Sequence, residues 1–200
     1  MASPRSFGIV VAIALNACLA PAEPAAVGDD GSVPVDAGSG GNAAGSLSPL
    51  AVGRTWTYDV TSTYPSCQSG THDTKVTAAS VAGGRQTLTV ENYCGSIGYS
   101  NVMGDRVEEY YNYGPSGWMR SLDVPVSDGH TWRTTNGSTT FDMAYDHIGT
   151  YEGHADCWRV TQQVAYESSW IYCRAVGLVK YEMIDLAGGT IVADLVRTNF

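Results

Sequence analysis

The stretch Thr55-Trp56-Thr57-Tyr58-Asp59-Val60-Thr61 decides the fold class of this chain. Its large apolar side chains stand at every second position, and threonine or aspartate fills the positions between them. Successive side chains of a β-strand point to opposite faces, so this alternation predicts a strand with one buried and one solvated face. Aromatic and β-branched residues of this kind also favour strands.

The same alternation recurs to the end of the chain. Further apolar sets at every second position are Leu88 with Val90, Trp158 with Val160, Val164 and Tyr166, and Val179 with Tyr181 and Met183. Turn signals separate the runs at Gly83-Gly84, Gly104-Asp105, Asn136-Gly137 and Gly188-Gly189. The Asn-Gly pair predicts a type I′ hairpin. No run has the period of an amphipathic helix. We therefore predict an all-β domain, a single antiparallel meander of about ten strands that forms a barrel or a curved half-barrel.

The N-terminus has the pattern of a secretory signal. An apolar run from Phe7 to Leu15 follows Arg5 and is too short for a bilayer, which needs about 20 apolar residues. The next residues, Leu15-Asn16-Ala17-Cys18, resemble the lipobox of bacterial lipoproteins. We expect residues 1–17 to be a lipoprotein signal peptide and Cys18 to be lipidated, which would tether the chain to a membrane. The alternative is ordinary cleavage after Ala20 or Ala22, which would remove Cys18.

A compositional boundary separates the signal from the β-rich domain. Residues 18–48 are dominated by Ala, Gly, Pro and Ser, and their charged residues are all acidic. Such a segment cannot bury enough apolar surface to offset chain entropy, so we predict a disordered linker. The β-rich domain is expected over 49–200. The whole chain has 20 acidic and 11 basic residues, a net charge of −9. Because nucleic-acid binding needs a basic footprint, nucleic acid is excluded as a partner.

The remaining cysteines, Cys67, Cys94, Cys157 and Cys173, form no C-x-x-C pair that would indicate zinc. Outside the cytoplasm, disulfides are the expected state. Cys67 follows the first predicted strand and Cys94 ends the third, so these two lie at the same end of a meander. A turn at Glu167-Ser168 would place Cys157 opposite Leu178 rather than Cys173. A Cys157–Cys173 bond then needs a bulge; it is still the pairing we expect, and pairing across the two halves is the alternative.

Several motifs recur in one order over almost all of 49–200. They are Pro49-Leu50-x-x-Gly53-x-x-Trp56-x-Tyr58, Gly129 with Trp132, Cys157-x-Arg159-Val160, Trp170-x-Tyr172 and Gly177-Leu178-Val179-Lys180-Tyr181-Glu182. This order resembles a group of uncharacterised bacterial lipoproteins that share one β-rich domain. Two departures are Ala175, where that group has glycine, and Cys173, where it has a small residue. The resemblance implies an extracytoplasmic lipoprotein with an antiparallel, open-barrel fold similar to lipoprotein-carrier half-barrels. It supplies no catalytic residues.

Candidate catalytic and metal-binding groups are sparse. His147, His154 and Asp156 match no zinc spacing, so we expect no metal and no cofactor. Glu108 and Glu109 are consecutive on a strand and point to opposite faces, which argues against joint acid–base chemistry. We interpret them, with Asp105, as a solvated face. The chain has no Gly-x-Ser-x-Gly motif and no phosphate-binding glycine loop.

The segment Tyr110-Tyr111-x-Tyr113-x-x-x-x-Trp118 is the candidate ligand-binding site, because aromatic rings stack on sugars or line apolar pockets. Ordinary strand residues would explain it equally. The first functional hypothesis is a membrane-anchored, non-enzymatic binding module outside the cytoplasm, which holds an apolar ligand on a half-barrel. The second is a structural lipoprotein of the cell envelope that contacts protein or polysaccharide through the aromatic strand. An enzyme ranks last, because it requires a cleft with a perturbed titratable group.

Overall fold

The computed structural model describes residues 45–112, 115–163, 167–185 and 188–200. They form one antiparallel sheet of twelve strands. The strands are β1 (Thr55–Ser62), β2 (Gly70–Ala82), β3 (Arg85–Glu91), β4 (Ile97–Met103), β5 (Arg106–Tyr111), β6 (Gly117–Leu122), β7 (Thr131–Asn136), β8 (Thr139–Tyr151), β9 (His154–Gln163), β10 (Glu167–Cys173), β11 (Gly177–Ile184) and β12 (Thr190–Thr198). The predicted all-β meander is confirmed, with twelve strands where about ten were expected. Short strands such as β6, in which five of six residues are half-buried, lack the alternation that marks β1.

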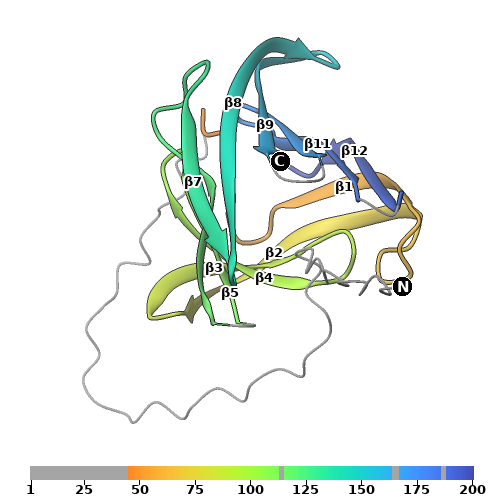
Figure 1. Ribbon diagram of the computed structural model, residues 1–200. Helices are drawn as coiled ribbons and strands as arrows, with labels where there is room; N and C mark the ends of the chain where they lie inside the picture. Colours follow the sequence, from red (N-terminus) through yellow and green to blue (C-terminus); the bar gives the residue numbers. More distant parts are fainter. Residues whose placement is uncertain (1–44, 113–114, 164–166, 186–187) are drawn as a thin grey trace, which may run out of the picture.

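The strand order is β6-β5-β4-β3-β2-β1-β12-β11-β10-β9-β8-β7. Except for β6 and β7, strands that are neighbours in the chain therefore pair with each other, and the first strand also pairs with the last. The two edge strands, β6 and β7, are consecutive in the chain and lie side by side. The Arg120 N–H donates to Thr134 Oγ1 over 2.7 Å, and the Trp132 indole N–H donates to the Arg120 carbonyl over 3.1 Å. The result is a nearly closed barrel (Figure 1).

The first strand behaves as its alternation predicts. Trp56, Tyr58 and Val60 are each 2% exposed. They belong to a cluster shared by β1, β2, β11 and β12, which also includes Val76 and Ile191. A second cluster fills the opposite side of the barrel between β5 and β9; its buried members are Leu47, Val107, Leu122, Trp132, Phe141, Met143, Tyr145, Trp158 and Val160.

Both disulfides are present. Cys67, in the β1–β2 loop, bonds to Cys94 in the β3–β4 loop. Cys157 and Cys173 face each other in the β9–β10 ladder and are also bonded. The expected turn at Glu167-Ser168 was wrong, because Glu167 already pairs with Gln163 as the first residue of β10. Residues 164–166, which connect β9 to β10, lie outside the described residues; the β9–β10 ladder has no bulge and places Cys157 opposite Cys173.

Most predicted turns are confirmed. Gly83-Gly84 joins β2 to β3, and Gly104-Asp105 joins β4 to β5. The hairpin at Asn136-Gly137 also exists, but Asn136 pairs with Thr139, so its two loop residues are Gly137 and Ser138. Gly137 has φ +61° whereas Ser138 has no positive φ. A type I′ turn needs positive φ at both positions, so that part of the prediction was wrong.

The predicted linker boundary at Ser48 was also wrong, because Ser46, Leu47 and Ser48 are buried in the barrel. The Leu47 N–H donates to Asp105 Oδ1 over 2.9 Å, and the Ala175 N–H donates to the Ser46 carbonyl over 2.8 Å. Small and polar composition predicts disorder only while no partner groups are available, and here the barrel supplies them. The remainder of the proposed linker, the signal peptide and Cys18 lie outside the described residues.

Within the described part of the chain, no helix is long and apolar enough to span a membrane.

Leu47 tests whether residues 45–48 are part of the domain. Its side chain is 0% exposed and packs in the β5–β9 cluster, so Leu47→Ala should lower the free energy of unfolding by about 2–5 kcal/mol. Val52 is 56% exposed, and Val52→Ala should change it by less than about 0.5 kcal/mol. Urea unfolding of the full chain with both disulfides intact measures the difference. Equal, small effects would show that the segment is not part of the packed domain.

Candidate functional site

The two larger core clusters do not meet completely, and a cavity of about 260 Å³ lies between them inside the barrel. Val107 and Leu122 from one cluster line it, as do Trp56, Tyr58 and Ile191 from the other. A second, smaller hollow of about 140 Å³ adjoins it and shares five lining residues: Val90, Asn92, Ser100, Glu109 and Met119. We call the two together the lumen.

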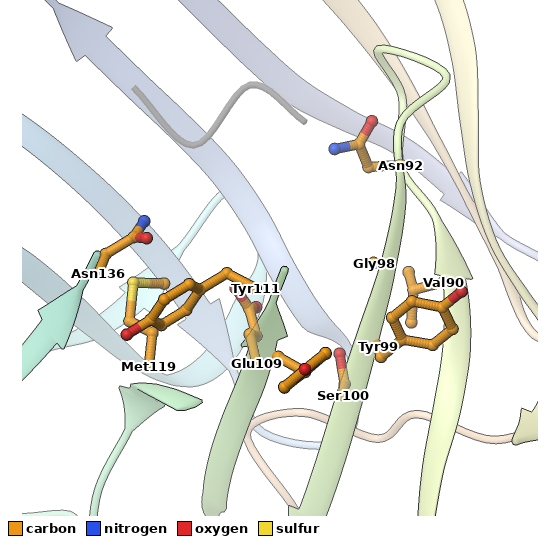
Figure 2. A pocket seen from close by; sticks show the side chains of 10 residues that line it. Val90, Asn92, Gly98, Tyr99, Ser100, Glu109, Tyr111, Met119 and Asn136 are labelled. Carbon is orange, nitrogen blue, oxygen red and sulfur yellow. The ribbon is translucent and has the colours of Figure 1, made fainter. Parts of the chain in front are cut away.

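Figure 2 shows the smaller hollow from close by. Tyr111, Met119 and Asn136 lie on one side, and Val90 and Tyr99 lie on the other. Glu109 lies between them. The site is therefore built from the walls of several strands rather than from one aromatic segment.

Aromatic side chains form one wall of the larger cavity. Ring centroids are 5.3 Å apart for Tyr58 and Tyr93, 6.3 Å for Tyr93 and Tyr181, and 5.4 Å for Trp170 and Tyr181. The wall is fixed in place because the Tyr58 hydroxyl donates to the Leu178 carbonyl over 2.8 Å. Sequence reasoning assigned Tyr58 and Tyr181 to buried strand faces but did not identify them as site residues. The period-two pattern could have identified both residues, because the side chains on the inner face of a barrel are also the ones that line its lumen.

Burial keeps the phenols of this wall protonated. It raises the pKa of Tyr58 well above its usual range, and it raises that of Tyr93 in the same way. Burial also raises the pKa of Tyr172, and the nearby charge of Glu109 adds to that effect. These side chains therefore present neutral rings and hydroxyl groups to the lumen at any physiological pH.

Glu109 is the acidic side chain of the lumen. It is exposed, but it lines both hollows, so the space it contacts is the barrel interior. The dense surrounding protein raises its pKa, and a hydrogen bond with Ser121 opposes that rise only in part. The described residues that line the two hollows include no lysine, arginine or histidine. Glu109 thus has no cationic partner in the lumen.

Glu108, the preceding residue, has the opposite environment. It lies on the other face of β5 and is 6% exposed. Its carboxylate contacts the guanidinium groups of Arg85 and Arg106, with Arg120 at 3.7 Å. Burial alone would raise the pKa of Glu108, but the hydrogen bonds from Arg106 and Arg85 outweigh it and hold that pKa below its usual range.

The expected division of Glu108 and Glu109 between two faces is confirmed, whereas the interpretation as a solvated face was wrong for Glu108, which is buried. Asp105 is not free in solvent either. Its two oxygens accept hydrogen bonds from the Leu47 N–H and from Arg174, so it anchors the N-terminal segment. Alternation cannot by itself say which face of β5 is inside, because that strand carries glutamate and tyrosine on both.

The residues of the predicted aromatic site have different surroundings in the structure. Tyr111 faces the lumen (Figure 2). The ring centroids of Tyr110 and Trp118 are 5.3 Å apart with the ring planes tilted by 53°, and the Arg85 guanidinium lies 4.6 Å from the centroid of the Trp118 ring. A Cβ at Gly83 would lie 2.6 Å from the Tyr110 ring, so this pair packs on the neighbouring turn. Tyr113 lies outside the described residues.

One further polar group faces the lumen without a partner. Thr74, on β2, lines the larger cavity, and its buried Oγ1 has no hydrogen-bond partner in the described structure. Buried hydroxyls are normally satisfied. Thr74 is therefore a candidate contact for a polar atom of a ligand, and no sequence signal identified it.

Of the residues considered for metal binding, His147 and Asp156 are neighbours in the structure. His147 Nε2 lies 3.6 Å from Asp156 Oδ1. The same carboxylate accepts the Trp158 indole N–H over 2.7 Å and pairs with Arg174 at 2.7 Å. Among the described residues, no three His, Cys, Asp or Glu side chains are grouped as metal ligands.

Comparison with known proteins gives only distant similarities. No protein-family model and no curated protein matches the chain. Among solved structures, a "putative lipoprotein" from Parabacteroides distasonis is 13% identical, with a TM-score of 0.41 over 78% of this chain and 99% of that one. A "putative exported protein with YmcC-like fold" from Bacteroides fragilis is 11% identical, with a TM-score of 0.39 over 78% of this chain and 100% of that one. Similarities this distant transfer no function.

The adjacent glutamates predict opposite effects of pH on stability. The raised pKa of Glu109 means that the folded state loses stability as pH rises from the ordinary carboxyl range through that pKa, so Glu109→Gln should gain stability relative to wild type with rising pH. The lowered pKa of Glu108 means that its contribution is complete above the ordinary range and is lost in acid. Glu108→Gln should therefore cost about 1.5–3 kcal/mol at neutral pH and less at low pH.

Urea unfolding of both variants at a series of pH values between 3 and 8 measures these two slopes. If the two differences from wild type change with pH in the same direction, the assignment of Glu109 to the interior is incorrect.

Proposed function

We propose that this protein is a non-enzymatic binding module, anchored to a membrane outside the cytoplasm, that holds a small and largely apolar ligand in the lumen of its barrel. The observation that carries the proposal is the cavity of about 260 Å³ between two otherwise packed cores. Ligand sites in proteins are concave and mostly apolar, with a few placed polar groups. The lumen has this composition: aromatic walls, Glu109 and Thr74.

The location outside the cytoplasm is supported by the chain's own features. The segment from Phe7 to Cys18 has the pattern of a lipoprotein signal. All four cysteines of the domain are paired in two disulfides, which persist in oxidising compartments. Residues between Cys18 and the barrel would then span the distance from the membrane surface to the domain.

The alternative partner site, an envelope protein or polysaccharide bound by the aromatic strand, is less well supported. Its described rings have different partners: Tyr111 lines the smaller hollow, whereas Tyr110, which also borders that hollow, packs its ring against Trp118. The described residues of this segment therefore do not form one continuous aromatic surface, and the lumen is the better supported site for a ligand.

Filling the lumen tests the proposed function. Met119 lines both hollows, so Met119→Trp should place a larger ring in the ligand's space. With the ligand bound, the larger side chain overfills the lumen, and we expect this to cost the bound state about 1–3 kcal/mol. Binding should therefore weaken by about fivefold to a hundredfold. The probe is neopentylbenzene, a neutral apolar molecule, and ligand-observed NMR measures its binding.

The protein for this experiment is the full chain with Cys18→Ser, folded under oxidising conditions. Met103→Trp is the matched control, because the Met103 side chain is 47% exposed. This variant should bind the probe with the same affinity as the parent protein. Failure of the parent to bind, or equal binding by Met119→Trp, would contradict the proposed site.

The lipid anchor has a separate test. If Cys18 is lipidated, the mature protein should begin at Cys18, carry the added mass of acyl chains and remain with the membrane fraction. Cys18→Ser should release it from membranes. Intact-mass spectrometry of the exported protein measures the N-terminus directly. A mature chain that begins at Pro21 or Glu23 would instead establish ordinary cleavage and a protein without this anchor.

A further inference from the structure

The lumen contains an acidic group that the protein itself leaves without a counter-charge. Glu109 lines both hollows, and the described lining of each lacks lysine, arginine and histidine. Its side-chain hydrogen bond is with the neutral Ser121. The chain does supply cations elsewhere on the same strands, because Arg85, Arg106 and Arg120 all approach the outward-facing Glu108. Their absence from the lumen makes Glu109 available to a ligand.

We propose that the ligand is an organic cation, an amine or quaternary ammonium group on an apolar body, with its charge placed between Glu109 and the aromatic wall. This inference rests on the proposed function and specifies the chemistry of its ligand. An apolar body fits the aromatic and aliphatic lining of the larger cavity. The cationic head supplies the counter-charge that Glu109 lacks.

The groups that face Glu109 favour a cation over an anion. They come from the elements around the lumen: Tyr58 on β1, Tyr93 in the β3–β4 loop, Tyr111 on β5, Tyr172 on β10 and Tyr181 on β11. Burial raises the pKa of Tyr58, Tyr93 and Tyr172, so these rings are neutral. The negative face of a neutral aromatic ring attracts a cation, whereas an anion would meet both these faces and the Glu109 carboxylate.

A cationic ligand also gives the acid at this position a function. A carboxylate lined by protein on several sides and without a cationic partner is less stable in its ionised form, and the raised pKa of Glu109 reflects this. A bound cation removes that cost and favours the ionised form. The unpartnered Thr74 Oγ1 on β2 offers a hydrogen bond to a primary or secondary amine.

The test compares two probes of the same shape. Benzyltrimethylammonium carries a positive nitrogen where neopentylbenzene has a neutral carbon, so their affinities differ only through charge. For the full chain with Cys18→Ser at neutral pH, we expect the cation to bind about tenfold more tightly than the neutral probe. Glu109→Gln should reduce this ratio to about one while still binding neopentylbenzene.

Glu91→Gln is the matched control, because Glu91 is an exposed residue at the end of β3 and should leave the tenfold ratio unchanged. Equal binding of both probes by the parent protein, or a cation preference that survives Glu109→Gln, overturns the inference and leaves the proposed function intact. Binding of neither probe overturns both.

Discussion

The pairing of β1 with β12 is the interaction on which the rest of the structure depends. It joins two halves of six consecutive strands each, β1–β6 and β7–β12, into one sheet. Each half contains its own disulfide, Cys67–Cys94 in the first and Cys157–Cys173 in the second. Without the β1–β12 ladder, Trp56 and Tyr58 would lose the strands that cover them, and the lumen would have no wall on that side.

The N-terminal segment makes a second connection between the halves. Leu47 is bound to Asp105 in the first half, while Ser46 is bound to Ala175 in the second. Arg174 completes this contact, because it donates to the Gly45 carbonyl and pairs with Asp105. The segment thus fixes the relative position of the walls that enclose the cavity, and Ser48 and Pro49 themselves line it.

The sequence predicts the fold more completely than the site. The alternation in β1 and the glycine turns can be recognised from neighbouring residues alone. These local patterns predicted the meander. The position of Leu47 depends on groups far along the chain, such as Asp105, and local composition contains no trace of them. The location of Glu109 cannot be predicted locally either. Acidic and aromatic residues occur on both faces of β5, and only closure of the barrel determines which face is inside. The turn predicted at Glu167-Ser168 was misplaced because these two polar residues already belong to β10.

The barrel wall is mechanically uneven. Eleven pairs of adjacent strands are joined by backbone ladders, whereas the described contacts between β6 and β7 are side-chain hydrogen bonds through Thr134 and Trp132. A ladder resists separation along its full length, but a few isolated bonds can be broken one at a time. The barrel therefore has one compliant seam, and Met119 and Asn136, which line the smaller hollow, belong to the two strands that border it. If the interior expanded around a larger ligand, β6 and β7 would separate before any other pair of adjacent strands.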